Sequence, residues 1–251
     1  MAGYAARVTL IWHMSNETPK PFVSVIIAAL NEEEAIANVI NSVPRNLADE
    51  ILVVDNDSKD RTAEIAKAAG ARITTEPIPG YGRAFRAGLR SISSECEIVV
   101  FLDGDGSDCP EMMGRLVAPI VEGKCDFVIG SRTRGKREAG SMVVHQVVAG
   151  YLIGFLLRLL YGVYSTDMGP FRAIRRDTLE KLNLCEETYG WPLEMQMQAA
   201  RAQVRTLEVP IDYRRRAGGH SKIAGTIRGT ILASTRILMT FARIAIQRNG
   251  R

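Results

Sequence analysis

Short runs rich in Val and Ile alternate with helix-like stretches over the first 130 residues, and this alternation constrains the fold more than any other feature. The runs predict strands at Val23–Ala28, Ile51–Asp55, Ala71–Thr75, Ile98–Leu102 and Phe127–Gly130. The stretches between them predict helices at Glu33–Val43, Arg61–Ala69, Gly82–Ser91 and Glu111–Val121. A repeated strand–helix–strand order is typical of a parallel sheet that helices cover on both faces. The sequence therefore predicts an α/β fold with a mainly parallel sheet.

After the fifth predicted strand the alternation stops. We predict a basic loop at Ser131–Arg137, a long apolar stretch at Met142–Tyr164 and a turn at Gly169–Arg172. A helix near 191–203 and a strand near 204–209 follow, and an amphipathic final helix covers roughly Thr226–Gln247. Crossing a bilayer takes about 20 uninterrupted apolar residues. His145, Gln146 and Arg158 interrupt the first apolar stretch, so we expect no membrane span there. The final helix carries Arg236 and Arg243, and it is expected either to pack on the domain or to lie on an anionic bilayer.

The chain has 251 residues, which is enough for one large α/β domain with a substantial core. No linker rich in Pro, Ser or Gly divides it. We therefore expect a loose tail over residues 1–20, one domain over 21–225 and a basic amphipathic helix over 226–251. The tail shows no secretory signal pattern. The four cysteines have neither a paired spacing nor a histidine cluster nearby, which predicts reduced thiols and a cytoplasmic protein.

Positive charge is concentrated toward the C-terminal end of the chain. The overall net charge is +4, but residues 201–251 contain eleven Lys or Arg against two acidic residues. Such a skew indicates an anionic partner, which could be nucleic acid, a phosphorylated substrate or anionic lipid. No pattern of aromatic residues accompanies these charges, and this disfavours single-stranded nucleic acid. We expect no nucleic-acid partner.

The fourth predicted strand runs directly into two carboxylates, in the sequence Val-Val-Phe-Leu-Asp-Gly-Asp-Gly-Ser at 99–107. The carboxyl end of a buried parallel strand is where α/β folds bind their ligands. Asp103 and Asp105 offer oxygen ligands that suit Mg²⁺ or Mn²⁺, and Gly104 and Gly106 leave space for a diphosphate. The motif therefore predicts a metal ion that holds a nucleoside diphosphate.

An acidic motif of this kind can also serve as a calcium loop or as a helix cap. A calcium loop of the EF-hand type begins with Asp-x-Asp as well, but it needs Gly at its sixth position and Glu at its twelfth. Counted from Asp103, these positions hold Asp108 and Gly114, so that loop is excluded. A helix cap would be an acidic turn before a helix starting near Pro110, with Asp108 as the N-cap. Capping and metal binding can coexist, because they use different carboxylates.

Polar residues also follow the first two predicted strands. Asn31 is placed to cap the helix after the first strand, and Glu32 lies near the positive end of that helix. Asp55 ends the second strand, where its carboxylate can accept a hydrogen bond from a base or a ribose. The turn that follows supplies a cap for the next helix from Asp57, Ser58 or Asp60.

Taken in order, these motifs resemble those of the family 2 glycosyltransferases of the GT-A fold. The motifs are Asn-Glu at 31–32, Val-Asp-Asn-Asp-Ser-x-Asp-x-Thr at 54–62, Asp-Gly-Asp at 103–105 and Arg-x-x-Gly-x-Ser-Lys at 216–222. Within this family, the chain is similar from about Val23 to Gly225 to the dolichol- and polyprenol-phosphate mannosyltransferases and glucosyltransferases.

The resemblance implies a Rossmann-like GT-A sheet and a nucleotide-sugar donor. It implies donor contacts at Ala28, Leu30, Glu32, Asp55, Asp57, Gly82, Asp103, Gly104 and Asp105. It also implies a Mg²⁺ or Mn²⁺ ion whose protein ligands are Asp103, Asp105 and Ser107. Members of the family often carry Gln at this position. The Ser107 found here is a poorer metal ligand than Gln.

For the acceptor, the resemblance implies contacts at Arg132, Glu194, Arg216, Ser221 and Lys222. It implies that the catalytic residues are Asp105, Arg132 and Arg216. A guanidinium suits phosphate because it can bind in bidentate geometry. A hydroxyl acceptor would need a general base, whereas a lipid phosphate is already anionic. The chain offers many arginines and no evident His–carboxylate pair, and this favours a phosphate acceptor.

We therefore expect an inverting transferase that moves mannose or glucose from a GDP- or UDP-linked sugar to polyprenyl or dolichyl phosphate. We also expect peripheral contact with the cytoplasmic face of a membrane. One alternative is a family 2 transferase that acts on a hydroxyl of a soluble or glycolipid acceptor. Another is a Rossmann-type nucleotide-binding module, which is disfavoured because Ala28–Glu33 holds no glycine for a Gly-x-Gly-x-x-Gly loop. The oligomeric state stays open, with a homodimer as one option.

Overall fold

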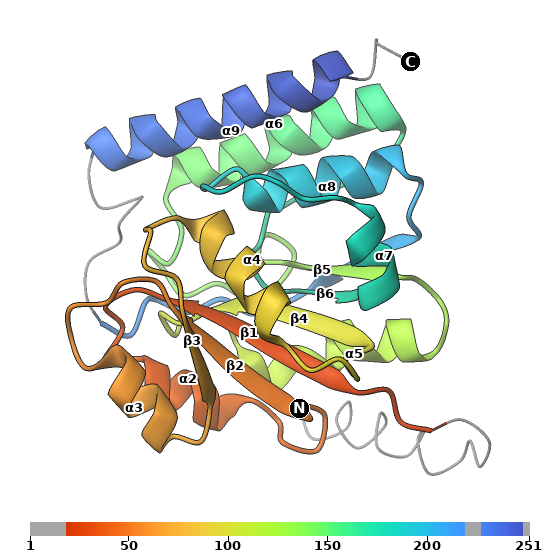
Figure 1. Cartoon of the computed structure of the whole chain (residues 1–251). Coiled ribbons are helices and arrows are strands. Elements are labelled where there is room, and N and C mark those ends of the chain that lie inside the picture. The colour runs from red at the N-terminus through yellow and green to blue at the C-terminus, as the bar shows by residue number, and fades with distance from the viewer. Residues whose placement is uncertain (1–18, 219–226, 248–251) are drawn as a thin grey trace.

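The computed structural model in Figure 1 describes residues 19–218 and 227–247. Within these ranges, seven strands form one sheet in the order β3-β2-β1-β4-β6-β5-β7. The strands are β1 (Val23–Ala29), β2 (Glu50–Asp55), β3 (Arg72–Thr75), β4 (Ile98–Asp103), β5 (Phe127–Ser131), β6 (Arg172–Arg175) and β7 (Thr206–Pro210). β6 runs antiparallel to its two neighbours, β4 and β5, and the other pairs are parallel. The mainly parallel α/β sheet that the sequence predicts is confirmed.

Helices occupy most of the connections between the strands. They are α2 (Ile36–Ser42), α3 (Thr62–Ala68), α4 (Tyr81–Ser91), α5 (Met113–Val121), α6 (Val144–Tyr161), α7 (Arg176–Lys181), α8 (Trp191–Arg201) and α9 (Ile227–Gln247), with a short 3₁₀ turn, η1 (Pro110–Met112), before α5. The strands and helices predicted for the N-terminal half are all present. The long apolar stretch forms α6, which ends at Gly162 because that residue takes the left-handed conformation, with φ 72°.

β6 and α7 lie outside the sequence prediction, which has only a turn at Gly169–Arg172. β6 is four residues long and begins with Arg172, a residue type that indicates a solvated loop. Here the Arg172 guanidinium is buried, and it donates to the main-chain carbonyls of Gly169, at 3.1 Å, and Pro192, at 3.0 Å. Gly169 belongs to the same turn, but Pro192 lies in α8, 20 residues away, and this distant acceptor is visible only in the tertiary structure.

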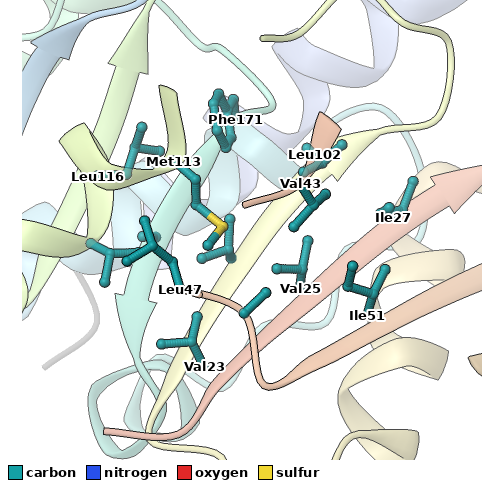
Figure 2. Close-up of a cluster of buried hydrophobic side chains, with 14 of the residues drawn as sticks. Val23, Val25, Ile27, Val43, Leu47, Ile51, Leu102, Met113, Leu116 and Phe171 are labelled. Carbon is teal, nitrogen blue, oxygen red and sulfur yellow. The ribbon is translucent and has the colours of Figure 1, made fainter. Parts of the chain in front are cut away.

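The sheet carries an apolar core on each face, because alternate residues of a strand point to opposite sides. On one face, β1 packs with residues of α2, α5 and the loops beside them, in the cluster of Figure 2 that includes Val23, Val25, Ile27, Leu47, Met113 and Leu116. On the other face, β1 packs with α4 and α8 through Ile26, Phe85, Trp191 and Met195. Both faces are thus covered, as a parallel sheet requires.

α8 separates the sheet from a further layer of helices. One side of α8 packs on the sheet, and its other side contacts α6 and α9 in a separate cluster of Ile153, Leu157, Leu193, Met197 and Ile244. Figure 1 shows α6 and α9 side by side over α8, away from the sheet. No helix in the described ranges is both long enough and apolar enough to cross a bilayer.

Candidate active site

A cavity of about 630 Å³ lies at the carboxyl ends of β1 and β4. One side of it, the sheet-edge wall, consists of Ala28, Ala29, Leu30, Glu32, Asn56, Asp103, Gly104 and Asp105. The other side, the helical wall, consists of Gln146 and Ala149 of α6, Pro192 and Leu193 of α8, and Ser234, Arg236 and Ile237 of α9. Further lining comes from the start of α4 and from Arg132, Asp167, Met168, Pro170, Thr188, Tyr189, Tyr213 and Arg216. The cavity lies at the strand end where the sequence predicts a ligand site.

Three carboxylates, those of Asp103, Asp105 and Asp108, lie close together at the end of β4. Asp103 is the last residue of that strand, and its Oδ1 accepts a hydrogen bond from the Tyr81 hydroxyl at 2.8 Å. Burial, followed by the negative charge of Asp105, raises the pKa of Asp103 to about 7. Asp108 is fully buried beside it, and burial together with the charge of Asp103 raises the pKa of Asp108 well above its usual range. The strand end therefore concentrates more negative charge than its surroundings neutralise.

The expected helix caps have a mixed outcome. Asp108 does not cap the helix near Pro110: its Oδ2 accepts from the N–H of Asp103 at 3.2 Å, and its Oδ1 has no hydrogen-bond partner in the part of the chain that the structure describes. Asn31 does not cap α2 either, because its Oδ1 accepts from the N–H of Lys59, across the loop, at 2.7 Å. Asp60 does bond the start of α3, with its Oδ1 accepting from the N–H of Thr62 at 3.0 Å. The side chains of Asp108 and Asn31 therefore bond main-chain N–H groups outside the helices instead of capping them.

Asp105 is held from two sides. Its Oδ1 accepts from the N–H and the hydroxyl of Ser107, at 2.9 and 2.5 Å. Its Oδ2 accepts from Nη1 of Arg216 at 3.1 Å, and Arg216 also forms an ion pair with Glu32. A main-chain bond from the N–H of Ala217 to the carbonyl of Asp105, at 3.0 Å, lays this segment over the motif. Arg216 thus lies beside two carboxylates of the sheet-edge wall.

The glycines of the motif permit these close approaches. A Cβ on Gly104 would lie 3.1 Å from the carbonyl oxygen of Ala28, which is tighter than ordinary contact. Gly106 has a φ of +77°, and a Cβ there would lie 3.0 Å from the Cβ of Ala217. A side chain at either position would therefore disturb β1 or the segment that carries Arg216.

Arg132 follows β5 and is paired with a buried carboxylate. Its Nε and Nη2 donate to the two carboxylate oxygens of Asp167, at 2.8 and 2.7 Å, and its own N–H donates to the same group at 2.8 Å. Burial alone would raise the pKa of Asp167, but Arg132 more than reverses this and lowers it. The guanidinium also lies over the ring of Tyr213, with Cζ 5.0 Å from the ring centroid. Arg132 therefore lines the cavity in a fixed orientation.

The carboxylates suit a divalent cation that is coordinated partly by the protein and partly by a bound substrate. In residues 19–218 and 227–247, no group of three or more His, Cys, Asp or Glu is arranged to hold a metal. Mg²⁺ in phosphate sites commonly takes one or two carboxylates and completes its coordination with phosphate oxygens and water. Asp103 and Asp105 meet this requirement. The unpartnered Oδ1 of Asp108 and the raised pKa of Asp103 mark an excess of negative charge that a cation would relieve.

The residues predicted for the donor fall into two groups. Those that come together in the sheet-edge wall are Ala28, Leu30, Glu32, Asp103, Gly104 and Asp105. Asp55, Asp57 and Gly82 do not line the cavity. Asp55 is buried, with no described residue bonded to its Oδ1, and Asp57 pairs with Lys59 at 2.7 Å. Gly82 is needed for packing, because a Cβ there would collide with the carbonyl of Glu186.

The residues predicted for the acceptor are also divided. Arg132 and Arg216 line the cavity, but Arg216 is bonded to the carboxylates assigned to the donor. Glu194 lies in α8 with only 1% of its surface exposed. It accepts from two main-chain N–H groups and from Arg243 of α9, and it does not line the cavity. Ser221 and Lys222 lie outside the described residues, as does the expected tail up to residue 18.

Several side chains of the cavity were not singled out by sequence reasoning, namely Asn56, Tyr81, Asp167 and Tyr213, and Arg236 was named only as a basic residue of the final helix. Asn56 and Tyr81 lie inside motifs, and their positions in 54–62 and in the Gly-Tyr-Gly at 80–82 were a usable signal. Asn56 accepts from the N–H of Gly80 at 2.8 Å and so positions the start of α4. Asp167 and Tyr213 carry no local signal, because their role depends on Arg132, which is distant in the sequence.

Known proteins are similar to this chain both in sequence and in structure. The family model described as glycosyl transferase family 2 matches residues 24–182. An uncharacterized glycosyltransferase of Mycobacterium tuberculosis is 36% identical over 211 residues, which cover 84% of this chain and 94% of that protein. The undecaprenyl-phosphate mannosyltransferase of Micrococcus luteus is 31% identical over 226 residues, with 82% and 89% covered.

Among solved structures, the glucosyl-3-phosphoglycerate synthase of Mycobacterium tuberculosis in complex with Mn²⁺, UDP-glucose and glycerol 3-phosphate gives a TM-score of 0.70. It is 23% identical, and the match covers 96% of this chain and 83% of that chain. At this identity the likeness is one of fold, and it confirms the GT-A architecture that the sequence predicts. With the family model matching well over half of the chain and the relatives matching most of their own length, the conclusion is that this chain belongs to glycosyltransferase family 2 and is a sugar-transferring enzyme.

Proposed function

We propose that the enzyme moves mannose or glucose from a UDP- or GDP-linked sugar to the phosphate of a polyprenyl or dolichyl lipid, with inversion at the sugar. One observation carries the proposal: a single cavity has carboxylates on its sheet-edge wall and the Arg132 guanidinium in its lining. No histidine is found among the lining residues of the described ranges. The undecaprenyl-phosphate mannosyltransferase relative supports the choice of acceptor.

The donor is proposed to bind along the sheet-edge wall. Asp103 and Asp105 would hold Mg²⁺ or Mn²⁺, and the ion would neutralise the diphosphate as it leaves. Tyr81 orients Asp103 by its hydrogen bond. Ser107 orients Asp105 in the same way, so we assign Ser107 a positioning role instead of direct coordination. Asp55, with an unpartnered carboxylate oxygen at the end of β2, remains a candidate for the base or ribose.

The acceptor chemistry follows from charge. A phosphate monoester is anionic near neutral pH and attacks without a general base, so positioning and charge neutralisation suffice. The carboxylate nearest to Arg132, Asp167, is already bonded to it through both oxygens. Arg132 can still offer its Nη1 to a phosphate oxygen from an orientation that Asp167 maintains.

Membrane contact is proposed at α6, where an apolar stripe faces solvent. The α6 stripe consists of Val144, Val148, Tyr151, Leu152, Phe155 and Leu159, each more than half exposed. Leu238, Met239 and Ile246 of α9 are exposed as well. Neither helix contains an acidic residue, whereas both carry arginine, which suits an anionic bilayer. Both helices also wall the cavity, so a lipid could reach it directly from the bilayer.

The final helix has a different part in this contact from the one expected. α9 packs on α8, and its Arg243 is bonded to Glu186 and Glu194, each at 3.0 Å. Arg243 therefore holds α9 on the enzyme, and we assign the membrane contact to the α6 stripe instead.

The proposal is tested by sugar transfer in vitro. Purified enzyme with Mn²⁺ is given GDP-mannose or UDP-glucose, and a short-chain prenyl phosphate or the matching prenyl alcohol. We expect a glycosylated prenyl phosphate from one of the donors, with the anomeric configuration inverted as read by NMR. Transfer to the alcohol alone would overturn the phosphate acceptor in favour of a hydroxyl acceptor, and transfer to neither would overturn the prenyl acceptor.

A further inference from the structure

We propose that Arg236 of α9 binds the phosphate of the acceptor, so that the C-terminal helix forms part of the acceptor site. This inference rests on the proposed function, and it assigns the phosphate contact to a residue outside every motif of the chain. It depends on three features of the cavity: the ion pairs that its arginines form, the orientation of α9, and the distribution of acidic groups.

Among the described residues, three arginines line the cavity, and two of them already form ion pairs. Arg132 is bonded to Asp167, and Arg216 is bonded to Asp105 and Glu32. Arg236 also lines the cavity, and the described residues make no hydrogen bond or ion pair with its guanidinium. An anion that enters can therefore bind Arg236 without breaking an ion pair to any residue that the structure describes, which is not true of Arg216.

The orientation of Arg236 follows from contacts further along α9. Residues 236, 240 and 243 lie on one face of a helix, because they are spaced by four and seven positions. Arg243 donates to Glu194, which is almost wholly buried, and to Glu186. The hydroxyl of Thr240 donates to Glu186 at 2.9 Å. These contacts fix the rotation of α9, so the face that carries Arg236 is turned toward the body of the enzyme.

The distribution of acidic groups in the cavity favours different places for the donor diphosphate and the acceptor phosphate. Asp103, Asp105 and Glu32 all belong to the sheet-edge wall, whereas the described part of the helical wall contains no acidic residue. Asp167 also lines the cavity, but both of its carboxylate oxygens are bonded to Arg132, which neutralises its charge. Carboxylates repel a phosphate that no metal ion shields, and the repulsion is strong in a partly buried site. The acceptor phosphate is therefore more stable near Arg132 and Arg236. From there a prenyl chain can extend along Ala149 and Ile237 toward the α6 stripe.

The test separates the acceptor from the donor. In the full-length enzyme, Arg236→Ala should raise the apparent KM for a short-chain prenyl phosphate about 10- to 100-fold, the usual cost of losing a charged hydrogen bond. The affinity for UDP or GDP with Mn²⁺, measured by calorimetry, should stay unchanged. Arg236→Lys should recover part of the loss, because lysine keeps the charge without the planar fork. Direct binding of the prenyl phosphate, measured by calorimetry, should weaken in parallel.

The control is Arg158→Ala, which removes another exposed arginine of the helical layer that does not line the cavity. With a short-chain, water-soluble acceptor, its KM should equal that of the wild type. An unchanged KM in Arg236→Ala would overturn the inference, and so would a weaker nucleotide affinity, which would assign Arg236 to the donor. A wild-type enzyme that does not glycosylate prenyl phosphate at all would overturn the proposed function instead. Circular dichroism would verify that each variant is folded.

Discussion

The two walls of the cavity differ in how their charges are arranged. On the sheet-edge wall, Glu32 and Asp105 are paired with Arg216, and Ser107 fastens Asp105 from the other side. On the helical wall, Arg236 has no partner among the described residues, and most of its neighbours are apolar. In our proposal the sheet-edge wall takes the cation and the diphosphate, whereas the helical wall takes a single anionic group attached to an apolar chain.

The walls also differ in how they are built. The sheet-edge wall uses short segments at the ends of adjacent parallel strands, where β1 and β4 are in register from Val23 and Ile98 onward. The helical wall depends on α8, which packs on the sheet with one side and supports α6 and α9 with the other. Changes at the junction of the two walls should therefore have the largest effects.

The junction is the pair of Arg132 and Asp167. Asp167→Ala leaves the Arg132 guanidinium without its partner, with only 13% of that side chain exposed. Removing one member of a buried ion pair costs about 3–5 kcal/mol of unfolding free energy. Urea denaturation followed by circular dichroism should measure a loss of this size.

Two variants sharpen this result. Glu64→Ala removes the exposed pair with Arg61, where both side chains are about two-thirds exposed, and should leave the denaturation midpoint unchanged. The double variant Asp167→Ala/Arg132→Met should regain part of the lost stability, because it removes the unpaired charge. If Asp167→Ala is as stable as the wild type, the pair does not hold the two walls together.

The sheet-edge wall is tested by Asp105→Asn. This change removes one anionic oxygen from the proposed metal site while keeping the shape of the side chain, so the fold should persist. Electrostatic groups of this kind are commonly worth about 100-fold or more in turnover. We expect such a loss in kcat, together with loss of Mn²⁺-dependent binding of UDP or GDP in calorimetry.

Asp177→Asn is the matched control, since it removes a carboxylate on α7 that does not line the cavity. Its activity and its nucleotide affinity should equal those of the wild type. Full activity in Asp105→Asn would rule out the metal assignment.

The outer surface of the helical wall is tested on lipid vesicles. Phe155→Glu places a charge in the α6 stripe, where Phe155 is 63% exposed and thus free to contact lipid. Loss of an apolar contact worth about 1.5–3 kcal/mol predicts roughly a tenfold or larger fall in binding to anionic vesicles. Co-sedimentation with vesicles of phosphatidylglycerol and phosphatidylcholine would measure it.

Ile78→Glu is the control, because Ile78 is an exposed apolar residue between β3 and α4 and lies outside the stripe. It should bind vesicles as the wild type does. Equal binding by both variants would remove α6 as the membrane contact. A wild type that forms dimers, which Phe155→Glu dissociates, would assign the stripe to a second copy of the chain.

The smallest effect is expected at Ser107. Ser107→Ala removes one hydrogen bond to Asp105 but leaves the main-chain N–H in place. A positioning bond of this kind contributes about 0.5–1.5 kcal/mol, which predicts roughly a 2- to 10-fold weaker affinity for Mn²⁺ with nucleotide. A loss as large as that of Asp105→Asn would instead make Ser107 a direct metal ligand.

The sequence by itself determined the features that depend on neighbouring residues. Nearly continuous apolar runs such as 23–28 and 98–102 specify strands that are buried on both faces of the sheet. A strand that ends in Asp-Gly-Asp places Asp103 and Asp105 at a ligand-binding edge in any parallel sheet. Family, fold class and the acidic half of the cavity were therefore predictable, because each follows from short segments whose conformation is local.

Tertiary structure decided the features that depend on distant partners. Arg132 meets Asp167 across 35 residues, and Arg216 meets Glu32 across 184. Arg243 reaches Glu194 across 49 residues, and by doing so it turns Arg236 toward the cavity. No local pattern encodes such pairs, because the two partners lie far apart in the sequence and meet only when the chain is folded. The placement of α9 and the arginine that it contributes therefore become visible only in the folded chain.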